Sequence, residues 1–186
     1  MGIGTIVLLV VAAVVVLAVI GMYNNLVRMR KQVDNAWAQI DVQLKRRCDL
    51  IPNLVESVKG YAKHESGVFE RVTAARTRAM SVAGSGADRI AAETELSGAL
   101  KALNVQVEAY PDLKANTSFL QLQEELSATE NKISFARQHY NDSATNYNTA
   151  IAVFPANIIA GMFRFQDASL WQITDPAERE VPKVSF

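Results

Sequence analysis

The chain is poor in the residue types that build most catalytic and metal centres. Its 186 residues include one cysteine, Cys48, and two histidines, His64 and His139. A single cysteine excludes an internal disulfide and a zinc site made of four cysteines. Neither histidine has a glutamate three residues before it, as the carboxylate-bridged metal centres of helical bundles require. We therefore expect no metal ion, no cofactor and no catalytic residues.

Two features define the alternative of an enzyme. His64 and Glu65 begin like a zinc-protease motif, but Val68 stands where the second histidine is needed. Cys48 follows Arg46 and Arg47, and neighbouring arginines lower a thiol pKa. No histidine lies near Cys48 in the sequence to act as its base, so the simpler interpretation is a small residue near a helix end.

An excess of charge of one sign is also lacking. Lysine and arginine number 19, aspartate and glutamate number 19, and the formal net charge is zero. A protein that binds nucleic acid through its phosphates needs a basic surplus. We therefore expect no nucleic-acid partner.

The N-terminal segment is strongly apolar. No charged residue occurs from residue 2 to 27, and Ile6–Ile20 contains only valine, leucine, isoleucine and alanine. About 20 such residues span a bilayer core as a helix. Residues 1–22 are thus a predicted membrane anchor, represented by Ile6, Leu8, Val14, Leu17 and Ile20. A cleaved signal peptide is the alternative, but it requires basic residues before a shorter apolar run.

The rest of the chain is predicted to be all-α, because no long stretch alternates with period two. No glycine or proline occurs between Met22 and Ile51, so the transmembrane helix should continue as one rod, with Asn24-Asn25 as the only soft spot. We expect an antiparallel bundle of four long helices over residues 23–165, which includes a short helix at about 156–165. An extended tail should occupy residues 166–186.

Helix boundaries follow from glycine, proline and capping residues. Asp49 to Pro52 predicts a break, with a second helix over about 52–82 that turns Tyr61 inward. Gly84-Ser85-Gly86 predicts a connector and 88–109 a third helix, ended by Pro111. Ser118 and Gln121 form a capping-box pattern that should start the longest helix. Heptad spacing predicts coiled-coil-like packing for that helix through Phe119, Leu122, Leu126, Ile133, Ala136, Tyr140, Ala144, Tyr147 and Ile151.

Two polar clusters accompany these helices. Asp41 and Lys45 are spaced as an i,i+4 ion pair. Glu124, Glu125 and Glu130 form an acidic face on the longest helix. Either cluster could be a solvated surface, or a contact between helices or subunits.

Long segments of this sequence resemble the bacterial LemA family. The segments are 23–30, 36–55, 58–62, 64–65, 103–116, 119–126, 129–131, 140–141, 147–148, 154–155 and 179–186. The resemblance implies a membrane-anchored, antiparallel helical bundle with no established enzymatic activity. It places the chain at the bacterial inner (cytoplasmic) membrane, and Arg28, Arg30 and Lys31 after the span favour a cytoplasmic body over a periplasmic one.

The resemblance also marks polar residues beside the apolar seams. Buried polar groups need hydrogen-bond partners, so such residues suit a network that specifies one packing or one assembly. The assembly candidates are Trp37, Asp41, Arg46, Arg47, Asp49, Asn104, Glu108, Asn116, Glu125, Glu130 and Asn131. Further matches to the family motif are Pro52, Asn53, Tyr110, Pro111, Tyr140 and Asn141.

The functional hypothesis is a non-enzymatic scaffold that self-assembles on the membrane. Its expected partners are the lipid bilayer, further copies of the chain, and in some settings another membrane protein. The alternative is an adaptor or regulator of a membrane protease or envelope-stress system. That alternative is implied by the family's association with membrane proteases and by no residue of this chain.

Overall fold

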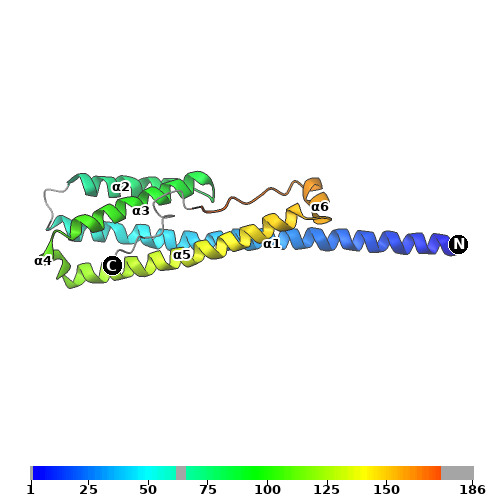
Figure 1. Ribbon diagram of the computed structural model, residues 1–186, viewed down its shortest axis with the longest axis horizontal. Helices are drawn as coiled ribbons and strands as arrows, with labels where there is room; N and C mark the ends of the chain where they lie inside the picture. The colour runs from blue at the N-terminus through cyan, green and yellow to red at the C-terminus, as the bar shows by residue number, and fades with distance from the viewer. Residues whose placement is uncertain (1, 62–65, 173–186) are drawn as a thin grey trace, which may run out of the picture.

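A computed structural model describes residues 2–61 and 66–172, and this part of the chain is helical with no strand. The prediction of an all-α fold is confirmed (Figure 1). The helices are α1 Ile3–Lys59, α2 Ser66–Ser81, α3 Ala87–Val107, α4 Pro111–Lys114, α5 Thr117–Ala152 and α6 Ala156–Met162.

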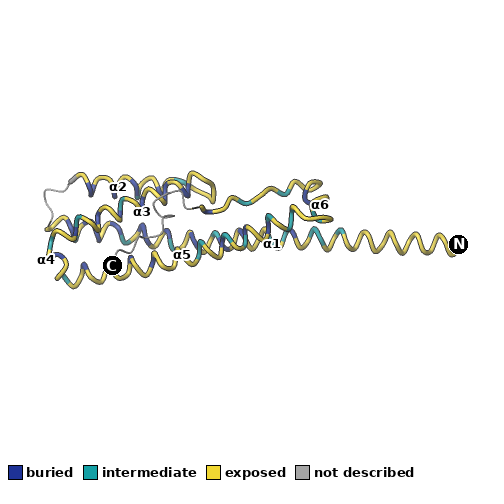
Figure 2. Tube along the Cα trace, in the orientation of Figure 1, coloured by how far each residue is buried: buried dark blue, intermediate teal, exposed yellow. Residues whose placement is uncertain are grey.

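The first part of α1 projects away from the rest of the molecule as an isolated rod (Figures 1 and 2). It is the one described helix that is long and apolar enough to cross a membrane, and none of its most apolar window is buried. The representative anchor residues Ile6, Leu8, Val14, Leu17 and Ile20 are all exposed. The helix continues without interruption through Asn24-Asn25 into the bundle.

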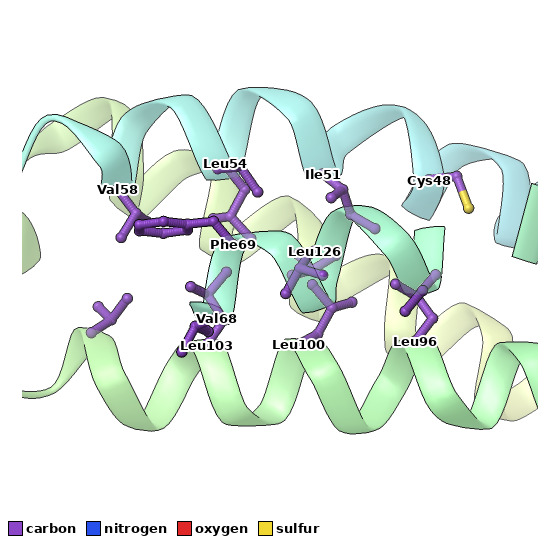
Figure 3. Packing of buried hydrophobic residues seen from close by; sticks show 14 of the residues in the cluster. Cys48, Ile51, Leu54, Val58, Val68, Phe69, Leu96, Leu100, Leu103 and Leu126 are labelled. Carbon is purple, nitrogen blue, oxygen red and sulfur yellow. The ribbon is translucent and has the colours of Figure 1, made fainter. Parts of the chain in front are cut away.

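Helices α1, α2, α3 and α5 run alternately up and down, so neighbouring helices are antiparallel (Figure 1). The α2–α3 hairpin packs against the C-terminal part of α1 and the N-terminal part of α5. Their shared core contains Ile51 and Leu54 from α1, Val72 from α2 and Leu96 from α3, all at most 2% exposed (Figure 3). The predicted glycine connector between α2 and α3 is confirmed: Gly84 has φ +87°, which suits a residue without a side chain.

Beyond the α2–α3 hairpin, toward the free end of α1, helices α1 and α5 continue side by side and share a second core, to which Ile90 of α3 and Trp171 also contribute. The seam predicted for α5 is confirmed. Six of its residues are buried, namely Phe119, Leu126, Ile133, Tyr140, Ala144 and Tyr147, while Leu122, Ala136 and Ile151 are half-buried.

The prediction that α1 breaks at Asp49–Pro52 is wrong. The helix passes through Pro52 and ends at Lys59, with Gly60 as its C-cap residue. The predicted second helix is therefore divided between the end of α1 and α2. Tyr61, expected to face inward, is 44% exposed.

Two predictions around α5 also need correction. Pro111 follows the end of α3 but also begins the short helix α4, because proline is tolerated in a first helical turn. The N-cap of α5 is Asn116, not Ser118: its side-chain oxygen accepts a hydrogen bond from the backbone N–H of Phe119 at 3.1 Å. Asparagine and serine cap helices about equally well, so the sequence pattern alone does not separate them.

Candidate functional site

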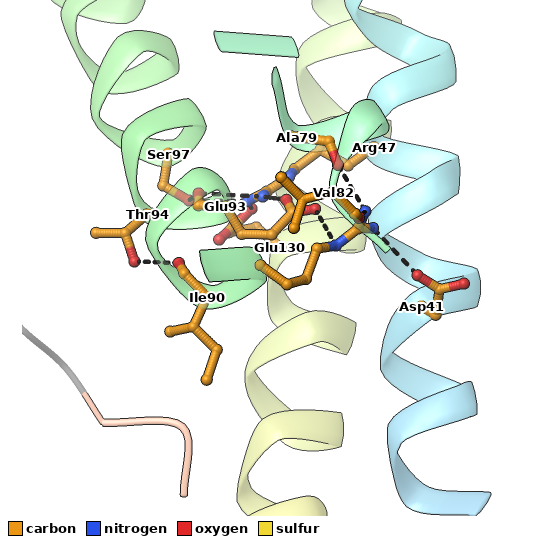
Figure 4. Close-up of polar contacts among 10 residues, drawn as sticks. Asp41, Arg47, Ala79, Val82, Ile90, Glu93, Thr94, Ser97 and Glu130 are labelled. Carbon is orange, nitrogen blue, oxygen red and sulfur yellow. Dashed lines mark hydrogen bonds and ion pairs between the residues drawn. The ribbon is translucent and has the colours of Figure 1, made fainter. Parts of the chain in front are cut away.

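A network of charged side chains lies in the middle of the four-helix part, where apolar residues would be expected. The guanidinium of Arg47 on α1 and the carboxylate of Glu93 on α3 are each 1% exposed and form an ion pair. Arg47 also reaches Glu130 on α5 at 3.0 Å and the hydroxyl of Ser97 at 2.9 Å (Figure 4). One arginine thus joins three helices.

Arg89 extends this network toward the α2–α3 connector. Its guanidinium lies 3.1 Å from Asp41 on α1 and 3.1 Å from the second carboxylate oxygen of Glu93. It also donates hydrogen bonds to the backbone carbonyls of Ala79 and Val82 (Figure 4). Arg89 therefore fixes the end of α2 and the start of the connector against α1 and α3.

The centre of the network is buried and its ends are exposed. The side chains of Arg47, Arg89 and Glu93 are at most 10% exposed, whereas the carboxylates of Asp41 and Glu130 are 58% and 48% exposed. Burying an ion pair gains little over well-packed apolar residues, because desolvation offsets the Coulomb attraction. Removing one partner is costly, since an uncompensated charge remains. The arrangement thus favours one alignment of the four helices over alternatives rather than adding much stability.

Pro52 explains a second polar contact between helices. Proline has no backbone N–H, so the carbonyl of Cys48, four residues earlier in α1, loses its usual helical partner. Nε of Arg76 on α2 donates a hydrogen bond to this carbonyl at 2.8 Å. The long-range contact provides the partner that the helix itself lacks, and α1 continues through the proline.

The Cys48 thiol is not activated by its surroundings. It is 2% exposed, and burial, with a further effect of the Glu93 carboxylate, raises its pKa. The arginines nearby lower the pKa, but their effect is smaller. The raised pKa argues against the alternative of a thiol activated by its arginine neighbours. The other enzyme alternative, His64-Glu65, lies outside the described residues.

The C-terminal segment 166–172 packs against α5 through a repeated Tyr-Asn pair. The side-chain amide of Asn148 donates to the carbonyl of Ala168 at 2.9 Å and accepts from its N–H at 2.8 Å. Asn141 holds Trp171 in the same two-bond manner, at 2.9 and 2.8 Å. The hydroxyls of Tyr147 and Tyr140 donate to the carbonyls of Gln166 and Ser169.

The spacing of this repeat matches the extended chain. Asn141 and Asn148 are two helical turns apart, about 10 Å along α5. Ala168 and Trp171 are three residues apart, which is also about 10 Å in an extended segment. Trp171 is 5% exposed, and its ring lies 5.5 Å from that of Trp37. Part of the predicted tail is thus a docked segment of the second core.

The assembly candidates lie in different parts of the bundle and make different contacts. Asp41, Arg47 and Glu130 belong to the charge network, and Trp37 packs between Tyr140 and Trp171. Arg46 and Glu125 approach each other at 3.9 Å on the surface, and Asn116 caps α5. The remaining candidates, Asp49, Asn104, Glu108 and Asn131, are exposed. Asp41 pairs with Arg89, whereas Lys45 was its expected partner.

Sequence reasoning missed Arg89 and Glu93, although a signal for them existed. The α3 seam Leu96, Leu100, Leu103 continues backward by three and then four residues to Glu93 and Arg89. Charged residues at seam positions, of opposite sign and one helical turn apart, are the pattern expected of a buried ion pair. Arg47 occupies the corresponding position in the α1 seam between Leu44 and Ile51.

The described residues contain no group of three or more histidine, cysteine, aspartate or glutamate side chains that could hold a metal ion. They do form several open grooves on the bundle surface, of which two lie between α5 and another long helix of the bundle. One, of about 440 Å³, lies between α1 and α5 and includes the exposed side chains of Val42 and Phe135. The other, of about 710 Å³, lies between α3 and α5 and mixes leucines with polar residues such as Lys101 and Glu124.

Known proteins similar to this chain point to one family. A Protein LemA from Metamycoplasma hominis is 28% identical over 156 residues, which cover 84% of this chain and 71% of that protein. Magnetosome protein MamQ 1 from Paramagnetospirillum magneticum is 24% identical, and MamQ from Magnetospirillum gryphiswaldense is 23% identical. These matches cover 81% and 77% of this chain but only 64% and 62% of the two MamQ proteins, less than two thirds of their length.

The family model of LemA proteins matches residues 36–186. The match begins inside α1, after the apolar segment, and includes every residue of the charge network and the repeated Tyr-Asn pair. It takes in most of the chain, and the chain therefore belongs to the LemA family.

Proposed function

We propose that this chain is a non-enzymatic scaffold, anchored in the bacterial inner membrane by the N-terminal part of α1, that self-assembles through the groove between α1 and α5. The observation that carries the proposal is the exposure of two large apolar side chains beside each other in that groove. Val42 is 64% exposed and Phe135 is 73% exposed. Fully burying such a side chain contributes about 1.5–3 kcal/mol.

The remaining lining of the groove suits contact with a second copy. Gln39, Gln43 and Lys132 surround the two apolar residues, so a polar rim encloses an apolar centre. In a two-fold symmetric dimer the same patch occurs on both sides, and each Phe135 would bury against the partner's groove.

Site-specific cross-linking tests the proposal. The single cysteine is buried, so Cys48→Ala gives a background for one new cysteine. Phe135→Cys should form cross-linked dimers in native membranes. Glu70→Cys, exposed on α2 and away from the groove, is the matched control and should not. Phe135→Glu in the otherwise unchanged chain should shift the detergent-solubilised protein to monomer in light scattering.

Equal cross-linking at both positions, or a monomer in light scattering for the unchanged chain, would contradict self-assembly. Release of the protein from vesicles by carbonate washing would contradict the membrane anchor. These two outcomes are independent, so anchoring and assembly can fail separately.

The second candidate function is an adaptor for a membrane protein, and the groove between α3 and α5 favours it. Leu100, Leu120 and Leu126 provide its apolar contacts, with Lys101 and Glu124 at its edges. Amphipathic helices dock in such grooves by their apolar face. Leu120→Glu should then abolish recovery of a specific membrane protein in affinity purification, while Phe135→Glu should leave that recovery unchanged.

A further inference from the structure

Helix α6 is fixed at the point where α1 leaves the bundle. The ring of Phe163, just after α6, lies 4.7 Å from that of Tyr23, and the ring of Phe165 lies 5.9 Å from it. Leu26 of α1 shares a small buried core with Ile159 and Ala160 of α6. In space, α6 lies at the end of the bundle from which α1 projects, and among the described residues only the free part of α1 extends beyond it (Figure 1).

The outer face of this region is apolar although it is exposed. Phe154 is 80% exposed and Met162 is 71% exposed. Three more large apolar side chains at half exposure or above complete the patch: Val153, Ile158 and Phe163. Isolated apolar side chains on a surface are ordinary, but five large exposed ones within residues 153–163 are the kind of concentration that marks a binding surface.

Most of the charges near the patch are basic. Between residues 153 and 165 the only charged side chain is Arg164, which is exposed. The acidic exception is Asp167, which is exposed and lines a groove with Ala160 and Gly161 of α6. On the neighbouring part of α1 the first charges are Arg28, Arg30 and Lys31, and no acidic residue precedes Asp34. An apolar face with aromatic residues and a basic border is the pattern of segments that lie in a membrane interface.

The position of the patch along α1 also fits a membrane interface. The apolar cluster that α6 shares with α1 extends along α1 from Val19 to Leu26, that is, from about 5 Å before Met22, the end of the apolar segment, to about 6 Å after it. The headgroup layer on each side of a bilayer is about 5–7 Å thick. A bilayer surrounding the apolar segment would therefore meet α6 at the depth of its headgroups.

We propose that α6 and its flanking residues, from Val153 to Arg164, form a second membrane contact that lies in the headgroup region of the bilayer crossed by α1. This inference rests on the proposed anchoring of α1. Phe154, Ile158 and Met162 enter the boundary between headgroups and acyl chains, and Arg164 lies among the lipid phosphates. The patch thereby fixes the rotation of α1 about its own axis as well as its depth.

Fluorescence quenching by brominated lipids tests this contact. The full chain with Cys48→Ala carries an environment-sensitive fluorophore on one new cysteine. It is inserted in vesicles of phosphatidylcholine and phosphatidylglycerol, brominated either near the headgroup or near the end of the acyl chain. The probe at Met162→Cys should be quenched most by shallow bromine. The probe at Val14→Cys should be quenched most by deep bromine, and the probe at Ser85→Cys, in the α2–α3 connector, by neither.

The possible outcomes distinguish the α6 contact from the α1 anchor and from a subunit interface. Quenching at Val14→Cys without quenching at Met162→Cys overturns the α6 contact and leaves the anchor standing. No quenching at Val14→Cys contradicts the anchor itself. If Met162→Cys is unquenched and instead cross-links to a second copy, the patch is a subunit interface and the inference is wrong. Phe154→Cys repeats the measurement from the other end of the patch, so the result does not depend on one substitution.

Discussion

Arg47 and Arg89 lie inside a helical bundle, and every helix around them contributes a hydrogen-bond acceptor. Carboxylates come from α1, α3 and α5, and backbone carbonyls come from the end of α2 and the connector. Glu93 is the centre of this arrangement, since it contacts both arginines and is itself 1% exposed. The two arginines therefore share one buried carboxylate, and each has one further carboxylate of its own, Glu130 for Arg47 and Asp41 for Arg89.

Glu93→Gln should destabilise the protein strongly. The amide keeps the shape of the side chain but leaves two buried guanidinium groups with less compensating charge, at a cost of about 3 kcal/mol or more. Glu95→Gln is the matched control two residues away. It breaks the exposed Arg78–Glu95 pair, which should cost less than about 1 kcal/mol. Urea unfolding of the full chain in detergent, followed by circular dichroism, measures both. Equal losses would contradict the central role of Glu93.

Contact between α5 and the C-terminal segment should weaken at alkaline pH. Burial raises the pKa of Tyr140, with a further effect of Asp34, and burial also raises the pKa of Tyr147. A raised pKa means that the folded state holds the proton more tightly than the unfolded chain. This contribution to stability is therefore complete below about pH 10 and is lost as the pH rises through the folded-state pKa.

Tyr140→Phe separates this effect from general alkaline unfolding. The variant loses the hydrogen bond to Ser169, at a cost of about 1 kcal/mol. Its stability should also fall less steeply above about pH 10. The free energy of unfolding of both proteins, measured as a function of pH, gives the comparison. Parallel curves would show that Tyr140 does not report on the alkaline transition.

At the scale of the helix, α1 depends on a contact that lies far away in the sequence. Pro52 removes a hydrogen bond within α1, and Arg76 on α2 replaces it at the carbonyl of Cys48. Local patterns predict a helix break at such a proline. The compensating donor, Arg76, is 28 positions away from the carbonyl with which it bonds, so the local sequence around Pro52 does not predict this contact.

A double-mutant cycle tests this explanation. Arg76→Ala should cost about 1–3 kcal/mol, because it leaves the buried carbonyl of Cys48 without a partner. In the Pro52→Ala background the helix supplies its own donor, and Arg76→Ala should cost clearly less. Additive effects, measured by urea unfolding of the four proteins, would show that the proline and the arginine are not coupled.

The helical parts of the fold were largely predictable, because the seam of α5 is regular over its whole length. The connector between α2 and α3 was also predictable, because glycine is the residue that most easily adopts the positive φ found at Gly84. Asp41, Arg47 and Glu130 were predicted as polar candidates, but their partners on α3 and the docked segment were not. The seam positions of Arg89 and Glu93 indicate burial without showing which charges on α1 and α5 they meet. Likewise, Asn141 and Asn148 do not indicate in the sequence that they hold Trp171 and Ala168.

At the scale of the whole molecule, the orientation in the membrane is the open prediction that a single measurement decides. Arg28, Arg30 and Lys31 are exposed directly after the apolar segment, which favours a cytoplasmic body. Ser85→Cys in the Cys48→Ala background should react with a membrane-impermeant maleimide in inside-out vesicles and not in intact spheroplasts. The reverse pattern would place the body in the periplasm.

Because α1 is continuous, a tilt of its apolar segment also tilts the part of α1 that lies in the bundle. From Tyr23 to Lys59 the helix is about 55 Å long, and no hinge separates this arm from the apolar segment. Membrane helices change their tilt with bilayer thickness, and a change of about 20° would carry the far end of the arm sideways by about 19 Å. A small change in the lipid would thus become a large displacement of the bundle's outer end.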